Sequence, residues 1–488
     1  MKKSRLKEIN FFQKSRSDTK WRIGLVYPNS YSIGMSGLSV KLLYHLLNQH
    51  QNIFTERIFF SANLPGPPRS IETGRTLSQF DILAFTFQFE LDYINAIRML
   101  QRSKIPVYAK NRTNNHPILI AGGPTVTTNP EPILDIVDVI FAGDFESVSN
   151  TFLQAVLSSK YNTLKEAILT IPGFYSSQEP SSKRISLQTQ DLDEVNYPVA
   201  QVRPVGTNMK KKGSLTGFLL QVSRGCTYAC HFCLIGKIYR PYRERSLTKL
   251  IQIITQGVKK TQTDFFSLIG SSTADYSKIK ELLNYFISNN IKFTLPSIRI
   301  DSGIEILELI KQIGQRNLSI APESGSEDIR YRIGKKISNK QISEFTLKAS
   351  QTKIQQLKLY FILGLTPDPF SESHEIINLV SNLINLNTLI KFNVSINPLI
   401  PKSGTKLSKR SVNYVEIQRG IDNLKQNLRD KVRFKFFPPH WAAIQAILSM
   451  GGREITPKAI KVAKTGGSYS SWKKTLKINP IIYYLKHY

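Results

Sequence analysis

All three cysteines of this 488-residue chain lie close together, at Cys226, Cys230 and Cys233. An odd number of cysteines at this spacing cannot form a framework of disulfides, and the sequence holds no further cysteine to pair with them. Clustered thiols in a reducing compartment usually bind metal. Three thiolates on one short loop can bind three corners of a four-iron cluster, which leaves the fourth iron open to another ligand. The alternative is a structural zinc site with His231 as fourth ligand, although such sites usually draw on two separated pairs of ligands.

Alternating apolar strands and helical segments over residues 1–165 predict a doubly wound, Rossmann-like α/β domain. A buried parallel strand is expected at residues 22–27, because this short run is apolar and contains β-branched residues. The other strands of the domain are expected at residues 58–62, 82–86, 118–121 and 139–142. The pattern weakens over residues 166–213, where Pro, Gly, Ser and Gln predict a linker.

A second alternating series predicts a partial barrel of six βα units over residues 214–402. Its strands are expected at residues 218–222, 265–269, 292–295, 317–321, 357–363 and 392–396. Barrels of this kind place their chemistry at the carboxyl ends of the strands, and the cysteine loop directly follows the first strand. Residues 403–488 are expected to form a small C-terminal extension packed on the barrel.

The cysteine loop, Ser-Arg-Gly-Cys-Thr-Tyr-Ala-Cys-His-Phe-Cys from residue 223 to residue 233, resembles the radical SAM superfamily. The resemblance implies a 4Fe–4S cluster on the three cysteines, and S-adenosylmethionine that is cleaved reductively to a 5′-deoxyadenosyl radical. It also implies that polar groups at later strand ends bind S-adenosylmethionine. These candidate residues are Gly270, Ser271, Arg299, Glu323, Ser324 and Gly364. The stretch Gly-Ser-Ser at residues 270–272 departs from the glycine-rich turn usual in the family. Purely structural roles stay open as alternatives for three of these candidate residues. Glu323 could cap a helix, Gly364 could form a plain turn, and Arg299 could form a structural ion pair.

Four N-terminal segments resemble the cobalamin-binding domain that precedes the barrel in some radical SAM proteins, many of them uncharacterised. These segments are residues 27–36, 121–124, 129–132 and 143–146. The resemblance implies a cobalamin site near the switch point of the first sheet, with Asn29, Ser32, Gly122 and Gly123 as candidate contacts. The usual Asp-x-His-x-x-Gly motif is absent, because none of the seven histidines has Asp two positions before it. Binding without a histidine ligand and loss of cobalamin binding therefore both stay open.

The chain carries 66 Lys and Arg against 35 Asp and Glu, a net charge of +31. Such an excess attracts anions, RNA among them, although a lysine-rich composition spread over the whole surface gives the same number. Three functions follow. The first is a cobalamin-dependent radical SAM enzyme that transfers a methyl group or rearranges an unactivated carbon. The second is a radical SAM enzyme that modifies RNA without cobalamin. The third is a non-catalytic iron–sulfur redox sensor.

The remaining expectations concern partners and location. A radical SAM enzyme needs a reducing partner, such as flavodoxin or ferredoxin. The N-terminal residues lack the apolar core of a signal peptide and no stretch is long and apolar enough for a membrane helix, so a cytoplasmic protein is expected. The sequence names neither a substrate nor a catalytic residue.

Overall fold

The computed structural model describes residues 8–11, 19–178, 185–204, 217–295, 297–386 and 388–488, which form two compact units. The first unit comprises residues 1–218, 252–263 and 448–478, and the second comprises residues 219–251, 264–447 and 479–488. This division differs from the expected domains, because residues 448–478 pack in the first unit instead of on the barrel. Within the described ranges, no helix is both long and apolar enough to cross a membrane.

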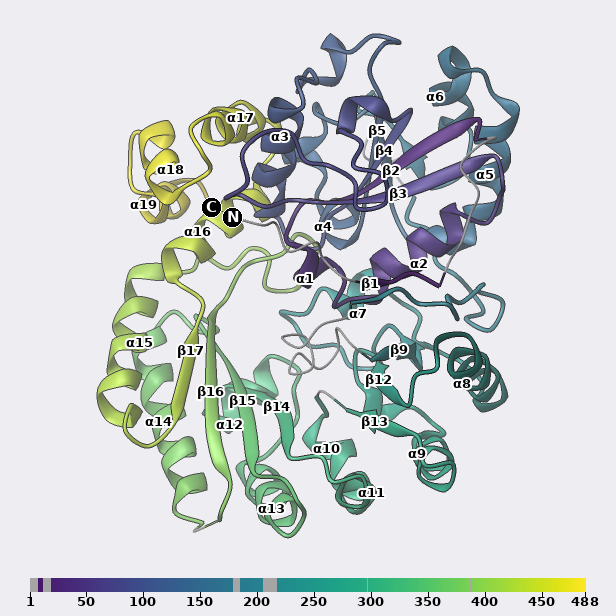
Figure 1. The fold of residues 1–488 in the computed structure, drawn as a ribbon. Helices are drawn as coiled ribbons and strands as arrows, with labels where there is room; N and C mark the ends of the chain where they lie inside the picture. Colours follow the sequence, from purple (N-terminus) through teal and green to yellow (C-terminus); the bar gives the residue numbers. More distant parts are fainter. Residues whose placement is uncertain (1–7, 12–18, 179–184, 205–216, 296, 387) are drawn as a thin grey trace. The chain divides into compact units, whose positions relative to one another are not determined.

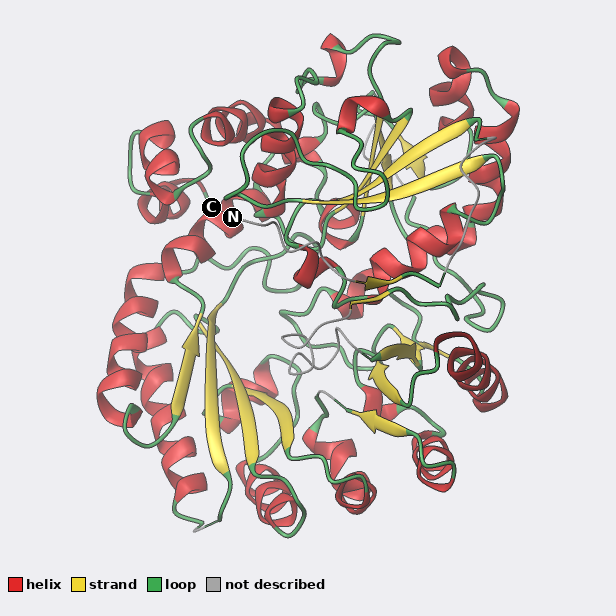
Figure 2. Ribbon diagram, viewed as in Figure 1, coloured by secondary structure: helices red, strands yellow, loops and turns green. Residues whose placement is uncertain are grey.

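The first unit is built on a six-stranded sheet in which all strands but the last are parallel (Figures 1 and 2). In spatial order, its strands are β3 (Ile53–Phe59), β2 (Trp21–Tyr27), β4 (Ile82–Thr86), β5 (Ile118–Gly122), β6 (Val139–Phe141) and β7 (Phe174–Tyr175). The first strand of this sheet, β2, lies in its interior. The chain then adds β3 on one side of β2 and β4 on the other, so a topological switch point lies between β2 and β4. Ligands of such sheets bind at the carboxyl ends of the strands beside this point.

Helices cover both faces of this sheet. One apolar cluster joins Ile23, Ile82 and Ile120 to α2 (Leu38–Leu47), α5 (Ser149–Ser158) and α6 (Tyr161–Leu169). On the opposite face, Phe85 and Leu119 alternate with these residues along the strands, and α3 (Asp92–Arg102) covers them. The remaining elements of this unit are β1 (Glu8–Ile9), α1 (Tyr31–Gly34), α4 (Pro124–Thr128), β8 (Arg203–Pro204), α17 (Thr456–Lys464) and α18 (Tyr469–Leu476). Of these, α17 packs against α3.

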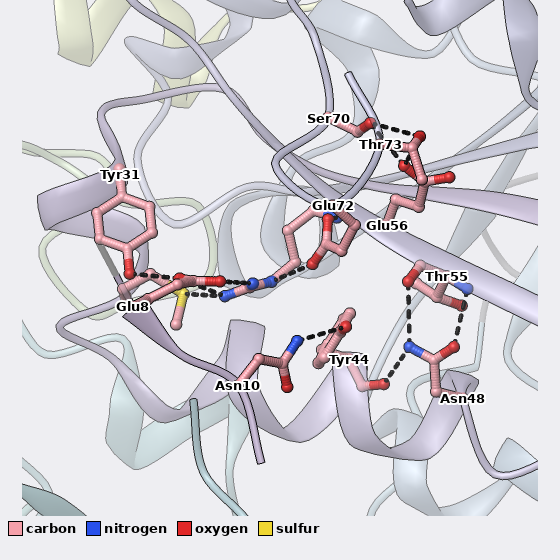
Figure 3. A network of polar contacts seen from close by, with 12 residues as sticks. Glu8, Asn10, Tyr31, Tyr44, Asn48, Thr55, Glu56, Ser70, Glu72 and Thr73 are labelled. Carbon is pink, nitrogen blue, oxygen red and sulfur yellow. Dashed lines mark hydrogen bonds and ion pairs between the residues drawn. The ribbon is translucent and has the colours of Figure 1, made fainter. Parts of the chain in front are cut away.

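The expected strand at residues 58–62 is wrong, since β3 occupies Ile53–Phe59. Its centre is polar yet fully buried, at Thr55, Glu56 and Arg57. The Arg57 guanidinium binds Glu8 and Glu72, and Figure 3 shows both carboxylates in the surrounding polar network. Burial by itself lowers the pKa of Arg57, but the two carboxylates outweigh it and raise the pKa, so the arginine stays charged. A strand of this kind has no apolar signature in the sequence.

The second unit holds two parallel sheets, and a row of helices covers the outer face of their strands (Figure 1). The first sheet has the order β13 (Lys292–Thr294), β12 (Phe265–Ile269) and β9 (Phe218–Gln221). The second has the order β14 (Asn317–Glu323), β15 (Gln356–Leu363), β16 (Lys391–Pro398) and β17 (Arg433–Phe436). Strands β9 and β12 to β16 lie close to the six expected positions. The last strand, β17, is an addition within the region expected to be a mere extension.

This row of helices lies outside the arc of strands, and we call the opposite side the interior face. Those outside the arc include α9 (Ile279–Ser288), α10 (Ile300–Gly303), α11 (Leu307–Gln312), α13 (Asn339–Ser350), α14 (Pro369–Ile384) and α15 (Tyr414–Leu428). The unit also contains α12 (Glu327–Arg332) and α19 (Pro480–His487). Helices α8 (Leu247–Thr261) and α16 (Pro439–Met450) each contribute residues to both units. A short ladder of β10 (Ser223–Arg224) and β11 (Arg243–Glu244), with α7 (Ile235–Ile238), frames the cysteine loop.

Candidate active site

The cysteine loop turns directly after β10, at a position that only glycine can occupy. Gly225 has φ of +85°, and a Cβ atom there would lie 2.3 Å from the carbonyl oxygen of Tyr239. Both the backbone angle and the contact therefore exclude a side chain at this position. The turn fixes the direction in which the chain enters Cys226.

The three thiols are half-buried, and Cys233 lies close enough to Cys226 and Cys230 to influence the pKa of both. Burial raises the pKa of Cys226 and Cys230, and the neighbouring Cys233 thiolate raises both further. Arg299 lowers the pKa of both thiols, and Lys335 lowers that of Cys230. Because cysteine binds metal as the thiolate, these two cations favour the form that binds. Three soft ligands on one loop fit the donor set of an iron–sulfur cluster.

A second loop, which follows α12, supports the cysteine loop from behind. The His231 N–H donates to the carbonyl oxygen of Ile333 at 2.9 Å. Gly334 has φ of +77°, and a Cβ atom there would lie 3.0 Å from the carbonyl oxygen of Ala229. The imidazole of His231 instead contacts Lys406, with 3.1 Å between Nε2 and Nζ. Among the described residues, no group of three His, Cys, Asp or Glu side chains is arranged to hold a single metal ion.

Arg299 lies over the cysteine loop in a fixed orientation. Its guanidinium carbon is 3.4 Å from the centre of the Tyr228 ring, and it forms a two-point ion pair with Asp301 at 2.8 and 3.0 Å. The Tyr228 hydroxyl in turn donates to Asp275 at 3.2 Å. Stacking and ion pairing together hold the guanidinium beside the thiols. Arg299 therefore has both expected roles. It forms a structural ion pair, and it also faces the cysteine site.

Glu323 ends β14 with φ of +69°, a conformation that non-glycine residues rarely adopt. Its carboxylate forms a buried ion pair with Lys335 at 2.8 Å. Rare backbone angles in non-glycine residues concentrate at functional sites. Ser324, the next residue, is buried, and its hydroxyl accepts a hydrogen bond from the Ser326 N–H at 3.2 Å.

The turn after β15 is built around a buried carboxylate. Glu372 on α14 accepts hydrogen bonds from three consecutive backbone N–H groups, those of Gly364, Leu365 and Thr366. Gly364 itself has φ of +95°. At the end of β12, a Cβ atom on Gly270 would lie 2.9 Å from the Ser223 hydroxyl, so glycine allows this close approach. Ser271 beside it is exposed.

A cavity of about 360 Å³ lies at the carboxyl ends of β14, β15 and β16. It is lined by residues of the cysteine loop, of the three strands and of the segment that follows β16. These residues are Phe232, Leu234, Ala321, Glu323, Tyr360, Ile362, Asn397, Pro398, Leu399, Ile400 and Lys402. The cavity therefore adjoins both the cysteine loop and the Glu323–Lys335 pair, and its size suits a small ligand.

In the first unit, Asn29 and Asp92 meet at the switch point. Asn29 follows β2, and Asp92 starts the helix that follows β4; the Asn29 amide donates to the Asp92 Oδ1 atom at 2.7 Å. The second oxygen of Asp92 is buried and accepts no hydrogen bond of full geometry in the described part of the chain, although Asn95 lies near the carboxylate and lowers its pKa. Burial raises the pKa of Asp92 to about 7, and the Glu90 carboxylate adds to the rise.

The other candidates of this unit differ in what surrounds them. A Cβ atom on Gly123 would lie 2.5 Å from the carbonyl oxygen of Phe87, and its φ is +107°, so local structure by itself requires glycine there. Gly122 has more room, with 3.7 Å to the nearest atom. The Ser32 hydroxyl contacts that of Ser30 at 3.1 Å. No described histidine of this unit lies at the carboxyl edge of the sheet: His45 and His50 precede β3, and His116 precedes β5.

Sequence reasoning missed several residues of both sites. Lys335 and Glu372 are among them, because each acts through a partner 12 or 8 residues away in sequence. Asp92 carried a usable signal, an acidic residue at the start of a helix that follows a buried strand.

Two family models match the chain. One, described as "Radical SAM proteins, N-terminal", matches residues 39–175, and the other, described as "Radical SAM superfamily", matches residues 220–380. The uncharacterized protein MJ0966 of Methanocaldococcus jannaschii is 28% identical over 403 residues, which cover 81% of this chain and 82% of the relative.

Two solved structures of the radical S-adenosylmethionine methyltransferase TsrM from Kitasatospora setae are similar to the chain. One, with cobalamin and a [4Fe–4S] cluster bound, aligns with a TM-score of 0.55 and 11% identity over 96% of this chain and 99% of that chain. The other, with tryptophan and an S-adenosylmethionine analogue bound, aligns with a TM-score of 0.51 and 12% identity over 77% of this chain and 73% of that chain. At this identity the likeness concerns the fold.

Proposed function

The chain belongs to the radical SAM superfamily, and on that premise we propose that it is a cobalamin-dependent radical SAM enzyme. Methyl transfer, or rearrangement at an unactivated carbon, is the reaction we propose. The radical SAM part of the proposal rests on the cysteine loop, whose thiols lie beside a fixed arginine and a cavity for a small ligand. When bound, the cluster and S-adenosylmethionine supply a reductive C–S bond cleavage that starts radical chemistry.

The residues of the second unit would have distinct tasks. Cys226, Cys230 and Cys233 would hold the cluster. Arg299 carries a fixed positive charge, which suits the carboxylate of S-adenosylmethionine. Glu323 lines the cavity and would accept hydrogen bonds from hydroxyl groups of the ligand. Phe232 of the cysteine loop also lines the cavity and would exclude water from it. Gly270, Ser271, Ser324 and Gly364 stay candidates for backbone or hydroxyl contacts.

The proposed cobalamin site lies at the switch point of the first sheet. Asn29 and the second oxygen of Asp92 offer polar contacts there, and Gly122 and Ser32 lie on neighbouring loops. A protonated carboxyl can donate a hydrogen bond to an amide of the kind that cobalamin carries on its periphery. The similarity of nearly the whole chain to a cobalamin-containing fold supports the proposal. The positions of the histidines favour binding in which none of this unit's described histidines coordinates cobalt.

The test of the radical half is anaerobic reconstitution of the full chain with iron and sulfide. The protein is then incubated with S-adenosylmethionine and dithionite, and 5′-deoxyadenosine is measured. We expect product from the wild type and none from Cys230→Ala. His231→Gln is the matched control: it should keep the iron content of the wild type, whereas a zinc site with His231 as ligand would lose metal. A fully loaded cluster that never cleaves S-adenosylmethionine would instead favour a redox sensor.

The test of the cobalamin half is separate. Titration of the reconstituted protein with hydroxocobalamin, followed by absorption after gel filtration, should show one bound equivalent. Absence of retained cobalamin would refute this half and leave the radical half intact. A one-electron donor such as flavodoxin or ferredoxin is the physiological reductant that we propose in place of dithionite.

A further inference from the structure

The register of the last three strands places four cations on the interior face of the second unit, and three of them fall in two neighbouring rows. Lys358 of β15 pairs with Asn393 of β16, which pairs with Arg433 of β17. In the next interior row, Tyr360 pairs with Ser395, which pairs with Lys435. Paired residues of a parallel sheet project from the same side, and Tyr360 lines the cavity at the carboxyl ends. Lys358, Arg433 and Lys435 therefore project from the cavity side of the sheet.

These interior residues do not serve packing. The alternate residues of β15 are apolar and fully buried under the helices, as Leu357, Leu359 and Phe361 show. Barrel interiors are ordinarily filled by branched apolar side chains as well. Here the interior positions along β15, β16 and β17 are mostly polar. They are Gln356, Lys358, Tyr360, Ile362, Lys391, Asn393, Ser395, Asn397, Arg433 and Lys435.

None of those interior positions carries a carboxylate to balance the cations. Lys358 donates to the Tyr360 hydroxyl at 2.7 Å and lies 4.3 Å from the centre of its ring, which orients the ammonium without neutralising it. Arg433 and Lys435 are exposed and form no ion pair within the described ranges. Of the nearby carboxylates, Glu323 of β14 is paired with Lys335, and Asp430, which lines a groove together with Arg433, contacts Arg429 at 3.8 Å.

The spacing of the three cations suits one compact anion. Neighbouring strands lie about 4.8 Å apart, so β15 and β17 are separated by about 10 Å, which two long side chains can span. A phosphate monoester carries about two negative charges at neutral pH and several acceptor oxygens, so it matches three cations better than one carboxylate does. The adjoining cavity of about 360 Å³ has room for a small molecule attached to that group.

We propose that the substrate is a small molecule bearing a phosphate group, which Lys358, Arg433 and Lys435 bind while its reacting part occupies the cavity beside the cysteine loop. This inference rests on the proposed function, because it names the substrate class of the same site. It also gives part of the chain's +31 charge a specific role.

Inorganic pyrophosphate is the probe, titrated calorimetrically into the full-length protein at fixed ionic strength. Arg433→Gln and Lys435→Gln should each weaken binding about tenfold, the effect of losing one charge-assisted contact. Lys425→Gln is the matched control, because Lys425 lies on α15 and contacts Phe436 on the opposite side of β17. It should leave pyrophosphate affinity unchanged. Circular dichroism of each variant verifies folding.

The possible results distinguish failure of the anion site from failure of the proposed function. Equal weakening in all three variants would mean attraction by overall charge and would overturn the proposal, as would the absence of pyrophosphate binding. Preferential binding of a short single-stranded RNA, competing with pyrophosphate and sensitive to Arg433→Gln, would also overturn it in favour of a nucleic acid substrate. Pyrophosphate binding by a wild-type protein that fails to cleave S-adenosylmethionine would refute the proposed function but not the anion site.

Discussion

Replacing Asp92 by Asn should stabilise the protein in a pH-dependent way. Asp92 is 2% exposed; one carboxylate oxygen accepts a hydrogen bond from Asn29, and the other is buried and accepts no hydrogen bond of full geometry in the described structure. Asparagine keeps the accepting oxygen and has the shape of the protonated carboxyl. The substitution therefore removes an ionisable group while it leaves the contact with Asn29 in place.

The magnitude follows from the pKa. Burial raises the pKa of Asp92 from 3.8 to about 7. Since one pKa unit corresponds to about 1.4 kcal/mol, ionising this carboxyl in the folded protein costs about 4 kcal/mol relative to the unfolded chain. Between these two pKa values the folded state binds more protons than the unfolded state. The contribution of Asp92 to stability therefore falls as pH rises from about 4 to about 7 and is constant above that.

Urea unfolding at pH 5 and pH 8, followed by tryptophan fluorescence, tests this expectation. Two of the three tryptophans, Trp21 and Trp472, are buried in the first unit, so their signal reports the unit that contains Asp92. At pH 8, the free energy of unfolding of Asp92→Asn should exceed that of the wild type by about 4 kcal/mol. At pH 5 the difference should be smaller. Glu166→Gln, at an exposed position of α6, is the control and should show no such pH dependence. A gain that is equal at both pH values, or a loss at pH 8, would refute the reasoning.

Three further substitutions test the sites from other directions. Gly225→Ala would place a Cβ atom 2.3 Å from the Tyr239 carbonyl oxygen, so the purified protein should retain clearly less iron and sulfide than the wild type after reconstitution. Glu323→Gln should weaken S-adenosylmethionine binding about tenfold in equilibrium dialysis, because the carboxylate that accepts from the ligand is lost; unchanged affinity would leave Glu323 a purely structural partner of Lys335. Glu72→Gln removes one of two carboxylates from the buried Arg57 and should cost about 3 kcal/mol in urea unfolding, whereas Asp328→Asn, in an exposed pair with Arg332, should cost less than about 1 kcal/mol.

Sequence reasoning succeeds where an element carries its own apolar signal. Strands β4 and β5 were predictable because their buried residues are consecutive and apolar. It fails at β3, where the burial of Thr55, Glu56 and Arg57 depends on partners outside the strand, such as Asn48 for Thr55 and Glu8 for Arg57. It also misses β17, because alternation of basic and aromatic residues over four positions resembles an ordinary exposed segment.

The same contrast explains the sites. The three cysteines are close together in sequence, so their shared chemistry can be recognised from the order of residues alone. Lys335 enters the site only because the loop after α12 folds behind the cysteine loop. Residues of this second kind become visible when the backbone brings them together.

The interior cations illustrate how far register alone can carry an inference. Lys358 and Lys435 are 77 positions apart, and each by itself would be taken as one more lysine in a basic chain. Pairing of β15 with β16 and of β16 with β17 places them in neighbouring rows of one face, on the side that lines the cavity. A lysine on the helix-covered side of the same strands would have to be buried among apolar residues, at a large desolvation cost. Cations are tolerated on the interior side because it is open to solvent or ligand. In an enzyme that binds an anion there, the same cations select the anionic ligand.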